Sequence, residues 1–310
     1  MGRHLDFLLR RILSTLVTLL LLVTFSFFLF RTFPGNPFSE ESNLSPEVVQ
    51  ILNQSYGLNQ PLLIQWSYFL KELIFHGGGS SFQNPDRTVL DLLTPSFLVT
   101  LKLSLLAFFG TLILTVLWTQ LFKEQSRLKP LKLPFISLFL SAPTLLLAPL
   151  LILLFGLSLD WLPVARLDHW TGYILPIAVM SLRPSVMLFR LFDSASEEQM
   201  RSQVTRTHRG FGFSENKILW KWNLKSSLIP CLHFIFPFLV GLLGGSVVVE
   251  MIFGIQGLGF QFLQALSYRD YPTLLFMTLG MGLFLQISSL LIDFSLARLD
   301  PRISLEGRGQ

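Results

Sequence analysis

Long runs without any charged residue constrain this 310-residue chain more than any other feature of its sequence. A helix needs about 20 consecutive apolar residues to cross the ~30 Å hydrocarbon core of a bilayer. Charged residues make up 14% of the chain, whereas a soluble domain carries roughly 25%. Together with a hydrophobic content of 51%, this excludes both a soluble globular protein and a disordered chain. The clearest uncharged runs are Ile12–Phe30, Leu103–Phe122, Leu133–Leu159, Ser226–Val249 and Tyr271–Ile292.

A sixth run, Gly172–Phe192, is interrupted by Arg183 and Arg190, but it completes a consistent topology. Lys and Arg are retained on the cytoplasmic side of membrane proteins. With six spans and the N-terminus inside, sixteen Lys and Arg residues fall in cytoplasmic segments and five fall outside. Omitting the sixth run would put the two most basic loops on opposite sides of the membrane. The sequence therefore predicts an all-α, polytopic integral membrane protein with six transmembrane helices and an N-in/C-in orientation.

The net charge of +5 follows from this topology rather than from a nucleic-acid surface. Nucleic-acid binding requires basic residues that gather in a patch on one folded surface. Here most of them lie in the segments assigned to the cytoplasm, so we expect no nucleic acid among the partners. The single cysteine, Cys231, excludes internal disulfides and cysteine-based metal clusters.

The usual catalytic motifs are absent from the sequence. No glycine is followed by lysine, which excludes a P-loop, and neither H-E-x-x-H nor G-x-S-x-G occurs. The middles of the predicted spans contain almost no acidic residue, whereas proton-coupled carriers bury such residues there. Arg183 is the one charge deep in a span. We therefore expect no catalytic residue and no metal site in this chain, and a source of energy outside it.

The predicted outside loop, residues 31 to about 96, is long enough to have structure of its own. Ser45-Pro46-Glu47 is a good helix start, with Ser as the N-cap and Pro in the first turn, and Gly57 is a stop signal. An amphipathic stretch with Trp66 and Tyr68 follows, and these residue types favour the membrane interface. The loop is either a cover on the outer membrane surface or a docking surface for a partner.

The predicted inside loop, residues 193 to 225, carries six basic residues and signals for a short helix. Glu197-Glu198 suits a helix start, because acidic residues favour the positive end of a helix. Gly210 and Gly212 on either side of Phe211 indicate a break. Such a helix could lie in a groove of a partner, or the loop could face anionic lipid.

Between the last two spans, the segment Glu250–Gly259 is rich in glycine next to apolar residues. Glycine permits tight turns and close helix approach, which favours a re-entrant or capping segment. The same glycines are only a very weak signal for a nucleotide-binding loop, because the segment is extracytoplasmic in the predicted topology and no Rossmann unit surrounds it.

Taken together, these motifs resemble the membrane permease subunits of binding-protein-dependent ABC importers, and specifically the first of the two permeases in oligopeptide and dipeptide systems. The similarity runs nearly from end to end, with departures at His208, Phe211 and Gln256. The matching residues are Leu9-Arg10-Arg11, Pro34–Phe38, Tyr56–Pro61, Arg190, Glu198, Arg206-Thr207, Gly212, Pro230, Glu250–Gly254 with Gly257-Leu258-Gly259, Arg269-Asp270-Tyr271, Asp293 and Asp300-Pro301-Arg302.

The resemblance implies the type I permease fold of ABC importers. Residues 1–96 would form the first transmembrane helix and a long extracytoplasmic loop. Residues 97–310 would form a five-helix permease core with a cytoplasmic coupling loop at about 193–225. The implied function is a permease subunit that forms half of the translocation path for peptides, and oligopeptides fit best. It would lie in the bacterial cytoplasmic (inner) membrane as a multi-pass protein.

The resemblance also implies the partners and the site residues. The partners would be a second permease subunit, two ATP-binding subunits, an extracytoplasmic substrate-binding protein, the peptide and membrane lipid. ATP and Mg would be used by the ATP-binding subunits, so this chain would hold no cofactor and would not be an enzyme. The ATPase-coupling residues would be Glu198, Arg206, Thr207, Phe211 and Gly212, and the extracytoplasmic gate would contain Glu250, Gly254, Gly257, Gly259, Arg269 and Asp270.

Each coupling residue has an expected role. Glu198 and Arg206 would fix the ends of the loop by ion pairs or capping. Thr207 and Phe211 would contact the ATPase, and Gly212 would allow a turn with positive φ.

Two other functions compete with this interpretation. A secondary transporter or channel is the nearest alternative, but the scarcity of acidic residues within the spans disfavours it. A membrane-embedded enzyme would need a reactive constellation within the spans, and the sequence shows none.

Overall fold

The structure is a computed structural model that describes residues 2–32, 37–38, 45–122, 127–164 and 169–299. Over these residues the secondary structure is helical, and the only β pairing is an isolated bridge between Ser80 and Thr88. The chain divides into two compact units. Unit 1 comprises Met1–Val99 and Gln256–Ile287, and unit 2 comprises Thr100–Ile255 and Ser288–Gln310.

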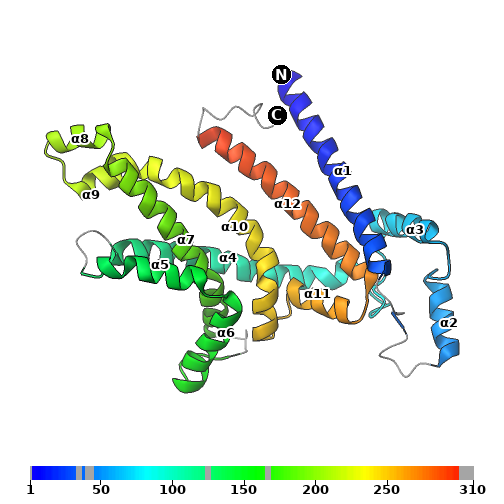
Figure 1. The fold of residues 1–310 in the computed structure, drawn as a ribbon. Helices are drawn as coiled ribbons and strands as arrows, with labels where there is room; N and C mark the ends of the chain where they lie inside the picture. Colours follow the sequence, from blue (N-terminus) through cyan, green and yellow to red (C-terminus); the bar gives the residue numbers. More distant parts are fainter. Residues whose placement is uncertain (1, 33–36, 39–44, 123–126, 165–168, 300–310) are drawn as a thin grey trace. The chain divides into compact units, whose positions relative to one another are not determined.

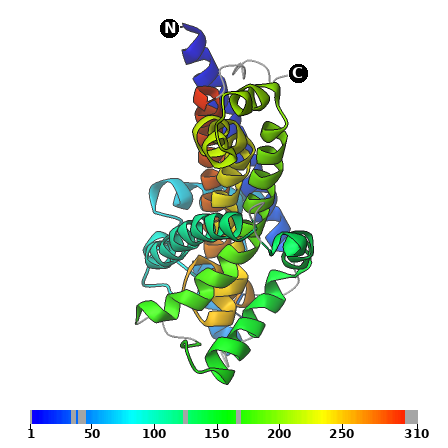
Figure 2. The same ribbon diagram turned by 90° about the vertical axis from the view of Figure 1, so that its left-hand side faces the viewer.

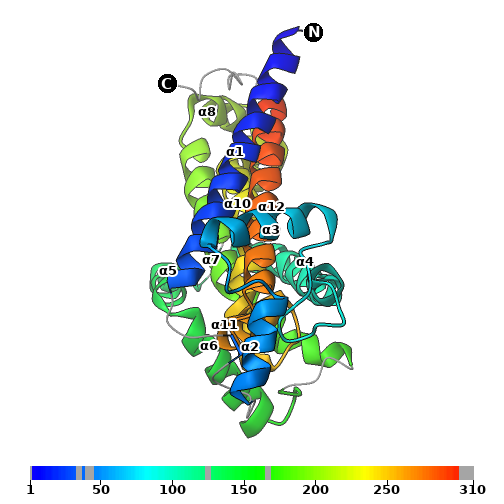
Figure 3. The same cartoon turned by 90° about the vertical axis from the view of Figure 1, so that its right-hand side faces the viewer.

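Unit 1 is built around two long helices that run side by side, the N-terminal α1 and the C-terminal α12 (Figures 1 and 3). A side chain at Gly282 in α12 would begin 2.5 Å from the end of Leu22 in α1, so the glycine permits a close approach. Short outer helices cover this pair, and Phe69 packs on Phe27 within their shared core. The elements are α1 (Gly2–Thr32), α2 (Pro46–Ser55), α3 (Leu62–Phe75), the start of α4 (Val89–Leu121), α11 (Leu258–Ser267) and most of α12 (Tyr271–Leu299).

Unit 2 is built around the packing of α7 (Ile174–Met200) against α10 (Leu224–Phe253). These are the green and yellow helices in Figures 1 and 2, and they bury Leu188 and Cys231 between them. On the other side of α7, Phe189 packs with Phe122, the residue directly after α4 (Val89–Leu121). The remaining elements are α4 from Thr100 onward, a 3₁₀ turn (Lys129–Leu131), α5 (Lys132–Ser141), α6 (Thr144–Leu151), a π turn (Ile152–Ser158), a 3₁₀ turn (Trp170–Tyr173), α8 (Gln203–Gly210), α9 (Glu215–Ile218), a π turn (Leu219–Asn223) and the end of α12 from Ser288.

The described residues contain four helices that are long and apolar enough to cross a membrane, and up to six crossings if each of two bent helix pairs is one span. The four single spans are Arg11–Thr32, Val89–Leu121, Trp170–Met200 and Tyr271–Leu290. The bent pairs are Lys129–Ser141 with Leu145–Ser158 and Ser246–Phe253 with Leu258–Ser267. The chain is therefore a multi-pass membrane protein, and six spans remain within this range.

Two of the predicted runs differ from the observed helices. The run Leu133–Leu159 is broken at Ala142, which adopts an extended ψ of 123° as the residue before Pro143. The helix predicted from Leu103 begins instead at Val89, so α4 includes Lys102 and Asp91 on its exposed side. By contrast, the helix start at Ser45-Pro46 is confirmed.

Candidate functional site

The segment that joins α7 to α10 folds into a compact helical turn at one end of unit 2 (Figures 1 and 2). The expected helix start at Glu197-Glu198 was wrong, because α7 continues through Met200. The acidic residues lie in its last turns instead. Lys132 at the start of α5 holds two of them, with its Nζ 2.7 Å from Asp193 Oδ2 and 3.1 Å from Glu197 Oε1.

The short helix α8 begins at Gln203, and Ser202 is its N-cap. Ser202 has an extended backbone with φ −66° and ψ 157°, and its Oγ accepts a hydrogen bond from the backbone N–H of Thr205. This satisfies one of the N–H groups that the first turn of a helix leaves unpaired. The cap therefore sets the direction of α8 relative to the end of α7.

The turn after α8 depends on Gly212. Its φ is 78°, in the left-handed region that disfavours residues with a side chain. Its N–H donates to the carbonyl of Arg209 at 2.9 Å, and the N–H of Phe213 donates to His208 at 3.3 Å. These bonds close the C-terminus of α8 and redirect the chain toward α9.

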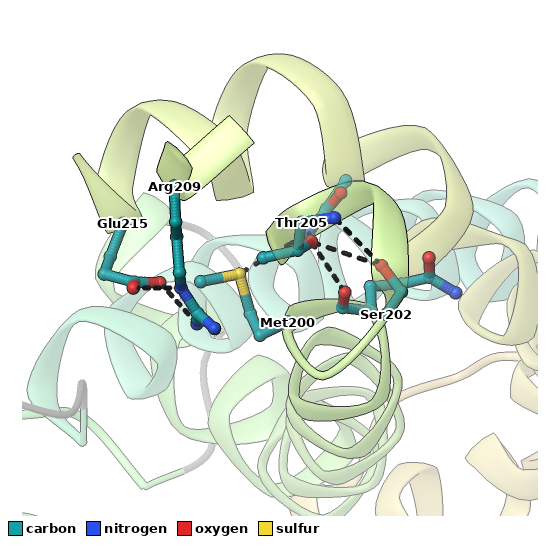
Figure 4. A network of polar contacts seen from close by, with 7 residues as sticks. Met200, Ser202, Thr205, Arg209 and Glu215 are labelled. Carbon is teal, nitrogen blue, oxygen red and sulfur yellow. Dashed lines mark hydrogen bonds and ion pairs between the residues drawn. The ribbon is translucent and has the colours of Figure 1, made fainter. Parts of the chain in front are cut away.

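A buried polar network connects α8 to both long helices, and Thr205 lies at its centre (Figure 4). The Oγ1 of Thr205 donates to the carbonyl of Gln199 at 2.8 Å and accepts from Asn223 Nδ2 at 2.9 Å. The Nδ2 of Asn223 also lies 3.4 Å from Met200 Sδ. Thr205 and Asn223 are 0% and 4% exposed, so water does not compete for these bonds.

A second set of contacts lies at the surface of the loop. The His208 ring lies 4.5 Å from the Trp222 ring, and Phe213 packs on Trp222 at 4.7 Å. Arg209 and Glu215 form an ion pair at 2.6 Å, seen beside the network in Figure 4. Both partners of this ion pair are largely exposed, so it stabilises the loop only weakly.

The outward side of α8 carries an apolar ridge, which we define as Val204, Thr207 and Phe211. These positions have the i, i+3, i+7 spacing of a helix face that seats in a groove. Val204 is 60% exposed and Phe211 is 72% exposed. Arg206 is exposed as well, about 100° around the helix from Thr207. The exposed part of α8 therefore offers an apolar contact and, on a different face, a positive charge.

The predicted outer segment begins at the end of α10 in unit 2. Glu250 is 0% exposed, and its Oε1 accepts a hydrogen bond from Thr100 at 2.7 Å. Gly254 ends α10 with φ 63°, and the N–H of Ile255 returns to the Glu250 carbonyl at 2.8 Å. Glu250 therefore has two structural roles: its backbone carbonyl caps the end of α10, and its side chain accepts a buried hydrogen bond.

The rest of the outer segment lies in unit 1, where Asp270 is the central residue. Its Oδ2 accepts from Ser81 Oγ at 2.5 Å and from Thr273 Oγ1 at 2.8 Å, while Oδ1 accepts from the N–H of Phe82 at 3.1 Å. These bonds connect the loop around Ser81 to the first turn of α12, and they are shielded from water because Asp270 is 2% exposed. Gly257 and Gly259 are buried at the start of α11, and Arg269 has a φ of 54°.

Unit 1 also encloses a cavity of about 380 Å³ beside α1, α2, α3 and α12. Six of the twenty residues that line it are aromatic, and the Arg31 guanidinium lies 5.1 Å from the centre of one of these rings, that of Tyr271. Burial and the negative charge of Asp270 raise the pKa of the Tyr56 hydroxyl, so it stays protonated at neutral pH. Among the described residues, no group of three or more His, Cys, Asp or Glu side chains could hold a metal ion.

Sequence comparison decides the family. Residues 111–305 match the family described as binding-protein-dependent transport system inner membrane component, and residues 4–104 match the N-terminal region of the same components. The chain belongs to this family. It is therefore a membrane-embedded transport subunit that works in an importer complex with other subunits.

Curated relatives match this family member over nearly their whole length. The oligopeptide transport system permease protein OppB of Haemophilus influenzae is 33% identical over 96% of this chain and 99% of its own. OppB of Escherichia coli K12 is 34% identical over 96% and 99%. The dipeptide transport system permease protein DppB of Bacillus subtilis is 30% identical over 98% and 99%.

Solved structures agree on the fold. A crystal structure of an amino acid ABC transporter with histidines has a TM-score of 0.51 at 16% identity, over 66% of this chain and 92% of that one. An inward-facing structure of the MetNI methionine ABC transporter also gives 0.51, at 18% identity over 67% and 96%. The chain thus has the permease fold of ABC importers.

The structure places the five predicted coupling residues on or beside α8 but gives them different surroundings. Arg206, Thr207 and Phe211 are exposed, and Gly212 forms the turn. Glu198 is also exposed, on the last turn of α7. Within the part of the chain that the structure describes, neither Glu198 nor Arg206 forms an ion pair, and Ser202 provides the cap. Their role in fixing the loop stays a prediction.

Sequence reasoning missed Thr205, Asn223 and Val204. Thr205 and Asn223 are 18 positions apart, and nothing in their spacing indicates that they meet. Val204 could have been found, because it precedes Thr207 and Phe211 by the periodicity of one helix face. Of the predicted outer residues, Glu250 and Asp270 prove to be buried hydrogen-bond centres, and their role as a gate remains untested.

Proposed function

We propose that this chain is one of two permease subunits of an ATP-driven ABC importer for peptides, most of all oligopeptides. The observation that carries the proposal is the end-to-end similarity to OppB and DppB proteins, at 30% to 34% identity. Because the alignment covers 96% or more of the chain, it includes the spans as well as both loops. In this role the chain supplies part of the path and performs no chemistry on the peptide.

In this proposal, α8 is the helix that contacts an ATP-binding subunit. Its apolar ridge suits an apolar groove, and the exposed Arg206 suits an acidic rim on that groove. ATP and Mg²⁺ belong to the ATP-binding subunit, so this chain needs no cofactor.

The orientation in the proposal follows the distribution of charge. An N-in/C-in arrangement puts α8 in the cytoplasm, where ATP is available, and leaves only five Lys and Arg residues outside. The same arrangement puts α2 and α3 outside the cell membrane. There they would receive a substrate-binding protein, and the segment with Glu250, Gly254 and Asp270 would lie near the outer gate. The membrane is the bacterial cytoplasmic membrane.

Affinity purification of the tagged chain from its own membranes tests this proposal. We expect recovery of a second permease subunit and two ATP-binding subunits, and ATP-dependent peptide uptake by the reconstituted complex. Recovery of the chain alone, with uptake that needs no ATP, would instead support a secondary transporter. Peptide competition during uptake would then distinguish oligopeptides from dipeptides.

The contact through α8 has its own test within the same complex. We expect Phe211→Ala and Val204→Asp to reduce the amount of ATP-binding subunit that co-purifies by at least several-fold, because each removes or charges the apolar ridge. Asn216→Ala, which changes an exposed residue on α9, is the matched control and should leave recovery unchanged. Equal recovery for all variants would exclude the ridge as the contact.

A further inference from the structure

We infer that Thr205 and Asn223 are positioning residues that lock α8 onto α7 and α10, so that a force applied to α8 moves the ends of both long helices together. The lock is a property of this chain alone, whereas its consequence for transport rests on the proposed function. Val204 and Phe211 of the ridge are exposed, whereas Thr205 and Asn223 are buried. Their role is to make the ridge rigid with respect to the spans.

The geometry places one hydroxyl at the junction of three helices. Thr205 belongs to α8, and its Oγ1 donates to Gln199 in the last turn of α7 at 2.8 Å. The same oxygen accepts from Asn223, the residue just before α10, at 2.9 Å. Asn223 also reaches Met200, the final residue of α7, with 3.4 Å between Nδ2 and Sδ. Side chains from the end of α7, from α8 and from the residue before α10 therefore meet around the Thr205 hydroxyl (Figure 4).

Burial makes this junction specific. Thr205 is 0% exposed and Asn223 is 4% exposed, so a displaced α8 would leave both polar groups without water or a protein partner. A buried donor or acceptor without a partner is costly, and this cost opposes any sliding of α8 relative to α7 or α10. The Ser202 cap, whose Oγ accepts from the N–H of Thr205 at 3.3 Å, adds a third restraint at the same residue.

The surface contacts of the loop cannot provide the same restraint. The ion pair between Arg209 and Glu215 joins α8 to α9 rather than to a long helix, and both side chains are largely exposed. The contact between the tilted rings of His208 and Trp222 includes no directional hydrogen bond. A movement of α8 by a partner would therefore reach α7 and α10 through Thr205 and Asn223.

The lock itself is tested by hydrogen–deuterium exchange on the purified full-length chain in detergent. Thr205→Val keeps the shape of the side chain but removes the hydrogen bonds of the hydroxyl to Gln199, Asn223 and Ser202, and Thr205→Ser keeps the hydroxyl as the matched control. We expect the backbone amides of α8 to exchange several-fold faster in T205V and at the wild-type rate in T205S. Unchanged exchange in T205V would overturn the inference.

The consequence for transport is tested with the reconstituted complex, by the number of ATP molecules hydrolysed per peptide imported. We expect T205V and Asn223→Ala each to raise this ratio several-fold while the ATP-binding subunits still co-purify. The double variant should be no worse than either single variant, because both changes remove the same connection. T205S should have the wild-type ratio.

The outcomes separate this inference from the proposed function. A wild-type ratio in T205V would overturn the role of the lock, even if the complex is an importer as proposed. A loss of ATP-binding subunits from T205V with normal exchange in α8 would overturn it too, because the residue would then act at the contact. If the wild-type chain recovers no ATP-binding subunit, the proposed function fails, and the exchange experiment still decides whether the lock exists.

Discussion

Gly212 and Gly254 end α8 and α10 in the same way, with left-handed φ values of 78° and 63°. A Cβ at either position would meet no atom within 4 Å, so the need for glycine comes from the backbone and not from crowding. The left-handed conformation is energetically unfavourable for residues with a Cβ, and asparagine tolerates it best among them. The two turns therefore require glycine only because of the backbone conformation, so a substitution at either position tests that requirement directly.

We expect Gly212→Val to leave membrane insertion intact but to uncouple ATP hydrolysis from uptake. The left-handed φ costs an L-residue about 1–2 kcal/mol, and a β-branched side chain makes the turn harder still. Gly212→Asn is the control, since asparagine tolerates this region, and it should retain most of the activity. Uptake by the valine variant at the wild-type rate would show that the turn is not needed for coupling.

The stability of unit 1 depends on a second single residue, Asp270. Its side chain is 2% exposed, and both carboxylate oxygens accept hydrogen bonds. Asp270→Asn replaces one carboxylate oxygen by an NH₂ group. At the Oδ2 position this group would face the two hydroxyls that now donate there, those of Ser81 and Thr273, and at the Oδ1 position it would face the N–H of Phe82. We expect a loss of about 1–3 kcal/mol in unit 1, the cost of a buried polar group left unsatisfied. Limited proteolysis near residue 81 measures it: faster cleavage than in wild type is expected, and Ser81→Ala should show a smaller increase.

The buried polar residues were also the hardest part of the site to predict from sequence. Glu250 and Asp270 were chosen as gate residues, but their partners Thr100 and Ser81 are 150 and 189 positions away. Pairings across such distances follow from the packing of helices, and no local pattern encodes them. Gly212 could be placed in advance, because a left-handed turn depends on the residue itself.

At the scale of helices, the absence of charge predicted where apolar segments lie but not where they bend. The run Leu133–Leu159 contains no charge, yet Pro143 removes an N–H donor and forces Ala142 into an extended conformation. Lys102 marked a false boundary in α4, because its side chain extends to Tyr173 and donates to the hydroxyl at 3.0 Å. A charged residue at the edge of an apolar run is therefore a poor guide to where the helix begins.

The close packing of α1 on α12 gives an element-scale prediction. A Cβ at Gly282 would lie 2.5 Å from Leu22 and 3.2 Å from Leu19, whereas a Cβ at Gly280 would meet nothing within 4 Å. We expect Gly282→Val to lower the stability of unit 1 by about 1–3 kcal/mol through overpacking. Gly280→Val provides the matched control two positions away on α12.

Thermal unfolding of the two variants in detergent, followed by tryptophan fluorescence, compares these glycines directly. The midpoint of the Gly282 variant should fall below that of the Gly280 variant, because both carry the same change in helix propensity and differ only in what the new side chain meets. Equal midpoints would show that α1 and α12 can separate without cost.

At the scale of the whole molecule, the number of crossings and the orientation are separate questions. Among the described residues, four helices qualify as single spans, and the total rises to six if each of the two bent pairs is one span. An even number of crossings would put the two termini on one side. The orientation depends on the charge count alone, since the same helices could be inserted either way round. The family assignment supports a cytoplasmic α8, and labelling can establish it.

We expect a cysteine at Lys71 to react with a membrane-impermeant maleimide in intact cells, and a cysteine at Asn216 to react only after the membrane is opened. Both positions are exposed, on α3 and α9 respectively, and the native Cys231 is buried, which keeps the background low. In the proposed six-span, N-in arrangement, α3 lies outside and α9 inside, because α4, the bent pair of α5 and α6, and α7 would each cross the membrane between them. The opposite pattern of labelling would invert the topology and remove α8 from the side where ATP is hydrolysed, so it would contradict the proposed coupling at the same time.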